Sequence, residues 1–260
     1  MGRKSFILAA IAVFITAAVF FLVPHKTKRI THPAIPSKKV HAQNKTPSLL
    51  ARQKGERISY DIRVGNVRFG NAWFLNMGIV SVAGKPLCLM QVQTNIGGRF
   101  IDNEKIYSDP QTALPIRVER NIQNWFNKER IIEEYNQQTY TVAITKFERA
   151  GKIKSSLKKE APIHNSILLP YTVRYMPNLT IGKTIIANLP TKRLAITLVA
   201  IETLNTPAGI FRAYHFSSNP KQIDIWISAD ERRLPIKVQD KSTLGYSMIL
   251  REYGFISLPE

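Results

Sequence analysis

The sequence predicts an all-β fold, a strongly curved antiparallel sheet or partial barrel, with one N-terminal transmembrane helix and at most one short helix in the domain. Three observations lead to this prediction: an uncharged apolar run near the N-terminus, alternation of apolar and polar residues after position 56, and turn-forming residues between the alternating runs. Alternation at period two is typical of strands with one buried face, and short turns between such strands favour antiparallel pairing.

Residues 1–5 form a basic start, and residues 6–23 form an apolar segment that we expect to be an uncleaved transmembrane signal-anchor. The segment has 18 residues, and Thr16 carries its only hydroxyl group. In a helix it would span about 27 Å at about 1.5 Å per residue, which is enough for a hydrocarbon core and longer than the apolar core of a cleaved signal peptide. The nearest small-residue cleavage motif, Val40-His41-Ala42, lies far beyond the segment.

Residues 24–55 are predicted to be a basic, disordered linker, because they combine prolines with polar residues that cannot bury a core. The chain has a net charge of +19, yet residues 1–55 contain ten Lys or Arg and no Asp or Glu, so that the remaining residues carry only +9. A basic tail beside a membrane segment favours anionic lipid headgroups, at about 1 kcal/mol per Lys or Arg. Nucleic acid is therefore not expected as a partner.

Residues 56–260 are predicted to be one antiparallel β domain. Many runs in this range have one apolar and one mixed face, so that the sheet should bury one side and leave the other wetter. The one segment with helical character is Ser166–Met176, which contains a proline. The clearest alternating runs begin near Tyr60, Tyr140, Ile196 and Leu234.

The domain contains no recognisable catalytic or metal-binding motif. Its two histidines, His164 and His215, are not spaced as metal ligands, and no serine, lysine or glycine-rich loop matches a known pattern. Glu133 and Glu134 are adjacent, and neighbours on a strand point to opposite faces, so they cannot share a substrate. We therefore assign no catalytic residue, no metal and no cofactor, and we expect Cys88, the single cysteine, to be a buried apolar residue.

Four stretches resemble the motifs of a bacterial exported family known as domain of unknown function number three thousand one hundred and eight. Ile225–Val238 followed by Gly245-Tyr246 is similar to its closing hairpin, and Gly65–Phe74 to its opening hairpin. Tyr107–Pro110 with Leu114–Arg117 resembles its middle strand, and Tyr171–Tyr175 with Ile181-Gly182 its short crossover. The resemblance covers nearly all of residues 57–255 and implies an exported, envelope-facing antiparallel β protein with no established catalytic residues. The long basic linker and the uncleaved anchor depart from the family pattern.

Two opposed signals bear on the orientation of the anchor. Basic residues flank both ends of residues 6–23, and the larger number on the C-terminal side would by itself place the domain in the cytoplasm. The positively charged start of the chain is instead typical of a secretory signal, and the resemblance implies export. We expect a single-pass protein of a bacterial cytoplasmic membrane with its domain on the periplasmic or extracytoplasmic side.

Aromatic and charged residues of these motifs form the candidate ligand or partner surface. In the closing hairpin, Asp230 is placed to accept hydrogen bonds from turn amides, and the arginines after it could meet a carboxylate or phosphate. The alternative is that the hairpin residues are structural and the aromatic ones belong to the core. The candidate residues are Trp73, Phe74, Arg174, Tyr175, Trp226, Asp230, Arg232 and Arg233.

Three functions fit these expectations. The first is a non-catalytic envelope protein that binds a lipid-like ligand in the concavity of its sheet or scaffolds an envelope protein at a sheet edge. The second is an envelope hydrolase or transferase that acts on glycan with carboxylates from separate strands, and the third is a binder of anionic surface polymer through its basic face. An open concave face lined by aromatic residues would favour a carried apolar molecule, whereas a filled one would leave only surfaces and edges.

Overall fold

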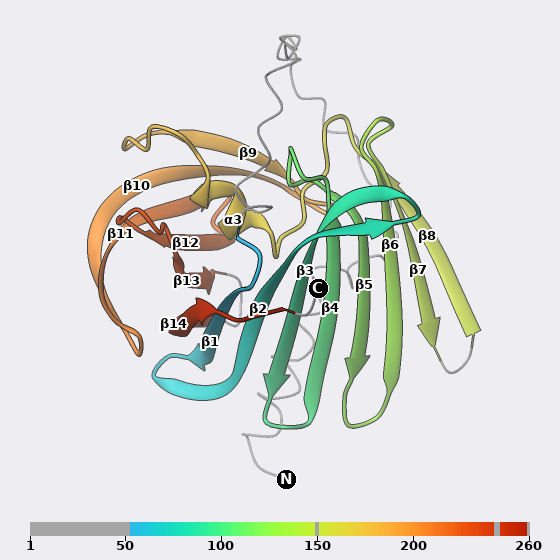
Figure 1. Ribbon diagram of the computed structural model, residues 1–260, viewed down its shortest axis with the longest axis horizontal. Coiled ribbons are helices and arrows are strands. Elements are labelled where there is room, and N and C mark those ends of the chain that lie inside the picture. The colour runs from blue at the N-terminus through green and yellow to red at the C-terminus, as the bar shows by residue number, and fades with distance from the viewer. Residues whose placement is uncertain (1–52, 149–150, 242–244, 259–260) are drawn as a thin grey trace.

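The computed structural model describes residues 53–148, 151–241 and 245–258 (Figure 1). The predicted anchor, residues 6–23, lies outside these ranges, as does the predicted linker up to residue 52. Within the described ranges, no helix combines the length and hydropathy needed to cross a bilayer.

The described residues form a single sheet of fourteen antiparallel strands that curls without closing (Figure 1), which confirms the all-β prediction. The order across the sheet is β8-β7-β6-β5-β4-β3-β2-β1-β14-β13-β12-β11-β10-β9, so that β1 and β14 pair at its centre. The strands of the first half are β1 (Glu56–Val64), β2 (Val67–Val82), β3 (Lys85–Ile96), β4 (Phe100–Ser108), β5 (Pro115–Gln123), β6 (Lys128–Asn136), β7 (Thr141–Glu148) and β8 (Gly151–Lys158). Those of the second half are β9 (Thr184–Asn188), β10 (Arg193–Thr206), β11 (Gly209–Asn219), β12 (Ile223–Ser228), β13 (Pro235–Asp240) and β14 (Tyr246–Phe255).

Turns and bulges fix the register of this meander. Ala83 and Gly84 connect β2 to β3 with φ angles of 50° and 75°, the left-handed conformation that tight two-residue hairpins require. Gly70 borders a β-bulge between β1 and β2, and a Cβ there would come within 2.1 Å of the Asn95 carbonyl oxygen. A glycine is therefore needed where β2 approaches β3 most closely.

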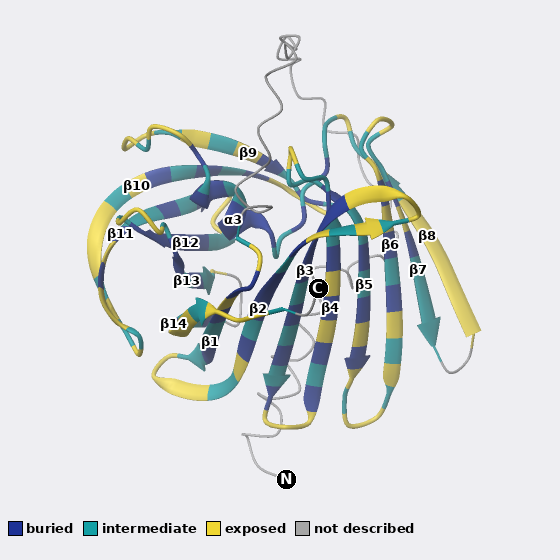
Figure 2. Cartoon of the chain, viewed as in Figure 1, coloured by how far each residue is buried: buried dark blue, intermediate teal, exposed yellow. Residues whose placement is uncertain are grey.

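The two faces of the sheet differ in burial. On β4, Phe100, Asp102 and Glu104 are buried, whereas Asn103 and Lys105 are exposed, and Figure 2 shows this alternation along the strand. We call the face that carries the buried side chains the inner face and the opposite one the outer face. The predicted combination of a buried side and a wetter side is confirmed.

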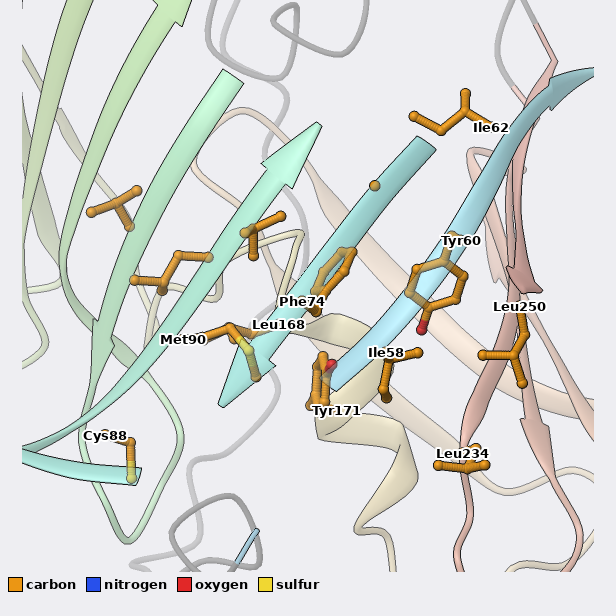
Figure 3. Packing of buried hydrophobic residues seen from close by; sticks show 14 of the residues in the cluster. Ile58, Tyr60, Ile62, Phe74, Cys88, Met90, Leu168, Tyr171, Leu234 and Leu250 are labelled. Atoms are coloured by element: carbon orange, nitrogen blue, oxygen red, sulfur yellow. The ribbon is translucent and has the colours of Figure 1, made fainter. Parts of the chain in front are cut away.

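Apolar side chains from β1 to β7 pack into one cluster on the inner face, together with Leu168 and Tyr171 from around α3 (Leu169–Arg174). Phe74 packs edge-on against Tyr60, with ring centroids 5.4 Å apart, and Figure 3 shows both beside Tyr171. These side chains form the larger of the two apolar clusters among the described residues.

The helix α3 lies inside the segment for which the sequence predicts helical character. Its Pro170 stands in the first turn, where a missing N–H costs little. Val173 packs into a second apolar cluster with residues of β10, β11 and β12. Arg174 donates to the two carboxylate oxygens of Glu56 at 2.7 and 2.8 Å and to the carbonyl oxygen of Arg232 at 2.8 Å. These bonds tie the helix to the first strand and to the β12–β13 hairpin.

Candidate functional site

An open groove of about 910 Å³ crosses the outer face of β3 to β7 beside the β5–β6 turn. Its lining combines amide, aromatic and charged side chains. Those that matter most below are Gln93, Asn103, Asn121, Phe126, Arg130 and Phe147. They come from five strands and one turn, so that only the folded sheet brings them together.

Side chains that are in register across neighbouring strands form one transverse row in this groove. Trp73 on β2 pairs with Gln93, Gln93 with Asn103, and Asn103 with Asn121. The Trp73 indole donates to Gln93 Oε1 at 3.0 Å, and Gln93 Nε2 donates to Asn103 Oδ1 at 2.7 Å. Because an indole N–H can only donate, Trp73 fixes the orientation of both amides. We call Gln93, Asn103 and Asn121 the amide row.

Aromatic rings with cationic side chains close to them lie at both ends of the amide row. The guanidinium of Arg57 lies 5.6 Å from the centroid of Trp73. At the other end, Arg130 and Lys152 lie 5.7 and 5.2 Å from the centroid of Phe147. A cation over a ring contributes about 0.5–1 kcal/mol at exposed sites, which helps to hold each ring in place.

The β5–β6 turn presents a further aromatic residue. Asn124 Oδ1 accepts hydrogen bonds from the backbone N–H groups of Phe126 and Asn127, both at 2.9 Å, which is an Asx turn. Phe126 is 93% exposed and lines the groove. An apolar ring left in water on a turn with fixed hydrogen bonds is available to pack against a ligand.

Two carboxylates stand at the margin of the groove, and both are paired with one lysine. Lys146 Nζ lies 3.2 Å from Glu129 and 2.6 Å from Glu148. No group of His, Cys, Asp and Glu in the described ranges is suited to hold a metal ion. The groove offers amides, aromatic rings and basic groups, with the two carboxylates at its margin.

A buried ionic cluster lies on the inner face of the same strands. Arg120 pairs with Asp102 and lies 3.4 Å from Glu104, and Tyr135 donates a hydrogen bond to Glu133. All five side chains are at most 7% exposed. Sequence reasoning missed this cluster, and its one signal is that charged residues occupy positions whose alternation predicts burial.

Burial sets the protonation of this cluster. It raises the pKa of Glu104 to about 8, with Arg120 opposing the shift and the neighbouring carboxylates of Asp102 and Glu133 adding to it. It also raises the pKa of Glu133, against the hydrogen bond from Tyr135 and the charge of Arg120. Three carboxyl groups around one guanidinium therefore hold less negative charge than three free carboxylates would.

Of the residues predicted as a ligand surface, Trp73 lies at the end of the amide row. Phe74, its neighbour, points the other way into the core. Trp226 is buried, stacked at 4.2 Å on the ring of His215, with Lys237 Nζ 4.4 Å from its centroid. The structure does not bring these three aromatic residues together.

The other five predicted residues gather around α3 and the β12–β13 turn. Asp230 Oδ1 accepts from the backbone N–H of Arg233 at 3.2 Å, the turn role that the sequence predicts, and its carboxylate pairs with Arg232. Arg233 donates to the Met176 carbonyl oxygen at 2.8 Å. Tyr175 donates to the Gln53 side chain at 2.6 Å, and Arg174 binds Glu56. All of these contacts lie within the chain and tie its parts together.

Comparison with known proteins finds remote structural likenesses. A beta-barrel-like protein of domain of unknown function DUF1849 from Brucella abortus is 8% identical, with a TM-score of 0.43, over 78% of this chain and 98% of that one. A Bacteroides fragilis protein described as exported, with a YmcC-like fold, is 8% identical, with a TM-score of 0.27, over 78% and 96% of the two chains. Likenesses of this size assign no ligand.

No curated protein is similar enough in sequence to count as a match. The family described as "Protein of unknown function (DUF3108)" matches residues 59–251, which include the amide row, the buried ionic cluster and α3. The match confirms the resemblance carried by the hairpin and crossover motifs. The chain belongs to this family.

Proposed function

We propose that this chain is a non-catalytic, membrane-anchored envelope protein that binds a glycan in the groove on its outer face. The observation that carries the proposal is the row formed by Trp73, Gln93, Asn103 and Asn121, whose side chains lie in register across four strands. A repeating ligand could lie across such a row and meet one side chain per strand, at about 4.8 Å per step.

The chemistry of the row matches sugar hydroxyl groups. An amide presents both donors and an acceptor, as a hydroxyl group does, so that amides and hydroxyls can satisfy one another without charge. Asn121 makes no side-chain hydrogen bond to another described residue, which leaves its amide available. Phe126 and Phe147 add apolar faces against which the C–H side of a sugar ring can pack.

The expectation of a lipid-like ligand has weaker support. Such a ligand needs an apolar cavity, and the apolar side chains that β1 to β7 place on the inner face pack against one another. A scaffolding role at a sheet edge keeps some support from β8, whose residues are exposed almost throughout. However, β8 carries Lys152, Lys154 and Lys158, and lysines on an edge strand disfavour pairing with a strand of another chain.

The proposed location rests on the sequence. Residues 6–23 would anchor the chain in a bacterial cytoplasmic membrane as a single pass, residues 24–55 would serve as a spacer, and the sheet would stand on the periplasmic or extracytoplasmic side. A glycan-binding surface held there by a tether would meet polymers of the cell envelope.

The test is a binding measurement with the full-length chain in detergent against a panel of neutral and anionic oligosaccharides. We expect at least one to bind, and Asn121→Ala and Phe126→Ala each to weaken that binding about tenfold, since a lost hydrogen bond or packed ring costs on the order of 1 kcal/mol or more. Matched controls are Asn205→Ala and Phe255→Ala, which change exposed residues on β10 and β14. Binding that is absent, or equally sensitive to the controls, would refute the proposal.

A second candidate is a glycan hydrolase, and one observation favours it: Glu129 and Glu148 both line the groove and come from different strands. Acid and base roles can be divided between two such carboxylates. Release of reducing ends from the bound oligosaccharide, abolished by Glu129→Gln or Glu148→Gln, would replace the non-catalytic proposal with this one.

A further inference from the structure

Three arginines converge on one buried aspartate on the outer face of β1. Asp61 is 0% exposed, and its carboxylate oxygens lie 2.5 Å from Arg251 Nε, 3.0 Å from Arg68 Nε and 3.1 Å from Arg63 Nη2. The three side chains remain 30% to 45% exposed. Their outer N–H groups therefore face solvent while Asp61 holds their inner ones. We call Arg63, Arg68 and Arg251 the arginine triad.

Two β-bulges set the direction of the side chains in the triad. The pairing of β1 with β14 shifts between Ser59 and Tyr60, which leaves Arg251 as the extra residue of β14. The pairing of β1 with β2 shifts between Ile62 and Arg63, beside Arg68. Bulges re-aim side chains and occur often beside functional sites. With regular pairing, Arg251 would stand opposite Tyr60, whose side chain lies on the inner face.

The triad carries more charge than Asp61 can neutralise. Burial alone would raise the pKa of Asp61, but hydrogen bonds from Arg251 and Arg63 hold it below its usual value, so the carboxylate is ionised. The three arginines and Asp61 together then carry a net charge of +2. Glu252 is a further carboxylate that acts on Arg251. Arg63 Nε is buried and makes no hydrogen bond to any described residue. An incoming anion would relieve the repulsion among the three guanidinium groups.

The triad and the groove share the outer face. Ser59 lies two residues before Asp61 on the same side of β1, about 7 Å along the strand, and it pairs with Trp73 at the start of the amide row. On the next step, Asp61 pairs with Asn71 and Asn71 with Asn95. A ligand that lies along the amide row and passes Trp73 therefore reaches the triad.

We propose that the arginine triad binds an anionic group, a carboxylate or phosphate, on the glycan that occupies the groove. This inference rests on the proposed function and narrows its ligand to an acidic glycan. Guanidinium groups bind both kinds of anion through paired, charge-assisted hydrogen bonds. The amide row would read the hydroxyl groups and the triad the charge.

The test compares two probes that differ only in charge: an oligogalacturonate with free carboxylates and its methyl ester, each with the full-length chain in detergent. We expect the free acid to bind about tenfold more tightly than the ester. Arg68→Gln should lower the affinity for the acid to that for the ester and leave the affinity for the ester unchanged. Asn121→Ala should lower the affinity for both probes. Arg193→Gln, an exposed arginine on β10, is the matched control and should change neither.

If Arg68→Gln does not fold, Arg68→Lys is the variant to test, because it keeps the charge beside Asp61 but loses the planar guanidinium group. It should weaken binding of the acid several-fold and leave binding of the ester unchanged. Equal binding of acid and ester overturns this inference and leaves glycan binding standing. Failure of both probes and of every other acidic glycan to bind refutes this inference, and it refutes glycan binding as well only if the neutral oligosaccharides also fail to bind. Glycerophosphoglycerol tests a lipid headgroup as the source of the anion. If it binds through Arg68 while the acid does not depend on Arg68, the triad serves lipid and the inference is wrong.

Discussion

Asp102 and Asn103 are neighbours on β4, but their side chains lie on opposite faces and take part in different networks. Asn103 accepts the hydrogen bond of Gln93 in the groove, and Asp102 pairs with Arg120 inside the core. The same holds on β5, where Arg120 precedes Asn121. The strands that carry the amide row are therefore held from behind by a buried ionic cluster, and changes to that cluster should be felt at the groove.

Arg120→Met should destabilise the protein by about 3–5 kcal/mol, because it leaves buried carboxyl groups without their cation. Urea unfolding of the full-length chain in detergent measures this. The control on the same strand is Arg117→Met, which breaks half-exposed pairs with Glu119 and Glu134 and should cost less than about 1 kcal/mol. Equal losses of unfolding free energy in the two variants would show that the buried cluster stabilises the protein no more than an exposed ion pair does.

Glu104→Gln should flatten the dependence of stability on pH. The folded pKa of Glu104, about 8, is raised above its ordinary value of 4.5, so the folded state holds the proton more tightly than the unfolded one. Its contribution to stability is fully present below about pH 4.5 and is lost as the pH rises toward 8. Between pH 5 and 8.5 the variant should gain on the parent by about 1 kcal/mol or more, one pKa unit being worth about 1.4 kcal/mol. Parallel pH profiles from urea unfolding would contradict the assignment.

Arg174→Lys should weaken the attachment of α3 by about 2–4 kcal/mol, because a lysine cannot reproduce the paired bonds to Glu56 together with the bond to the Arg232 carbonyl. Thermal unfolding followed by circular dichroism reports the loss. Arg232→Lys, at an exposed ion pair with Asp230, should change stability by less than about 1 kcal/mol. A milder effect at Arg174 than at Arg232 would mean that the buried pair is not the attachment.

Phe74→Ala and Phe126→Ala should have opposite signatures. Phe74 is packed in the core beside Tyr60, so its truncation should cost about 3–5 kcal/mol of unfolding free energy. Phe126 is almost fully exposed, so its truncation should stay within about 0.5 kcal/mol and act on oligosaccharide binding alone. A large stability loss at Phe126 would place it in the fold rather than in the groove.

Much of the fold was predictable because it follows from local patterns. The alternation predicts the buried Tyr60 and Ile62 on β1 and the buried Val142 and Ile144 on β7, and the proline-containing segment Ser166–Met176 holds α3. Cys88 is buried, as its apolar neighbours predict. Glu133 and Glu134 point to opposite faces, with Glu133 in the core.

The candidate sites were much less predictable, because they depend on register. Gln93, Asn103 and Asn121 are ordinary polar positions in the sequence, and only strand pairing makes them one row. The arginine triad joins residues from β1, β2 and β14, and Asp61 and Arg251 stand 190 positions apart in a sequence that carries no sign of their contact. Among the candidate residues taken from the motifs, Trp73 alone lies beside the groove. A motif indicates a local hairpin, but it does not indicate which other strands lie next to that hairpin.

By itself, the sequence determined the class of fold, the sheet's division into a buried and a wetter face, and the family. These depend on side-chain periodicity and turn chemistry, which act over a few residues. Tertiary structure alone decided which polar residues meet, because the pairing of fourteen strands sets register across the sheet and each bulge redirects the residues around it. The groove, the buried ionic cluster and the arginine triad are products of that pairing.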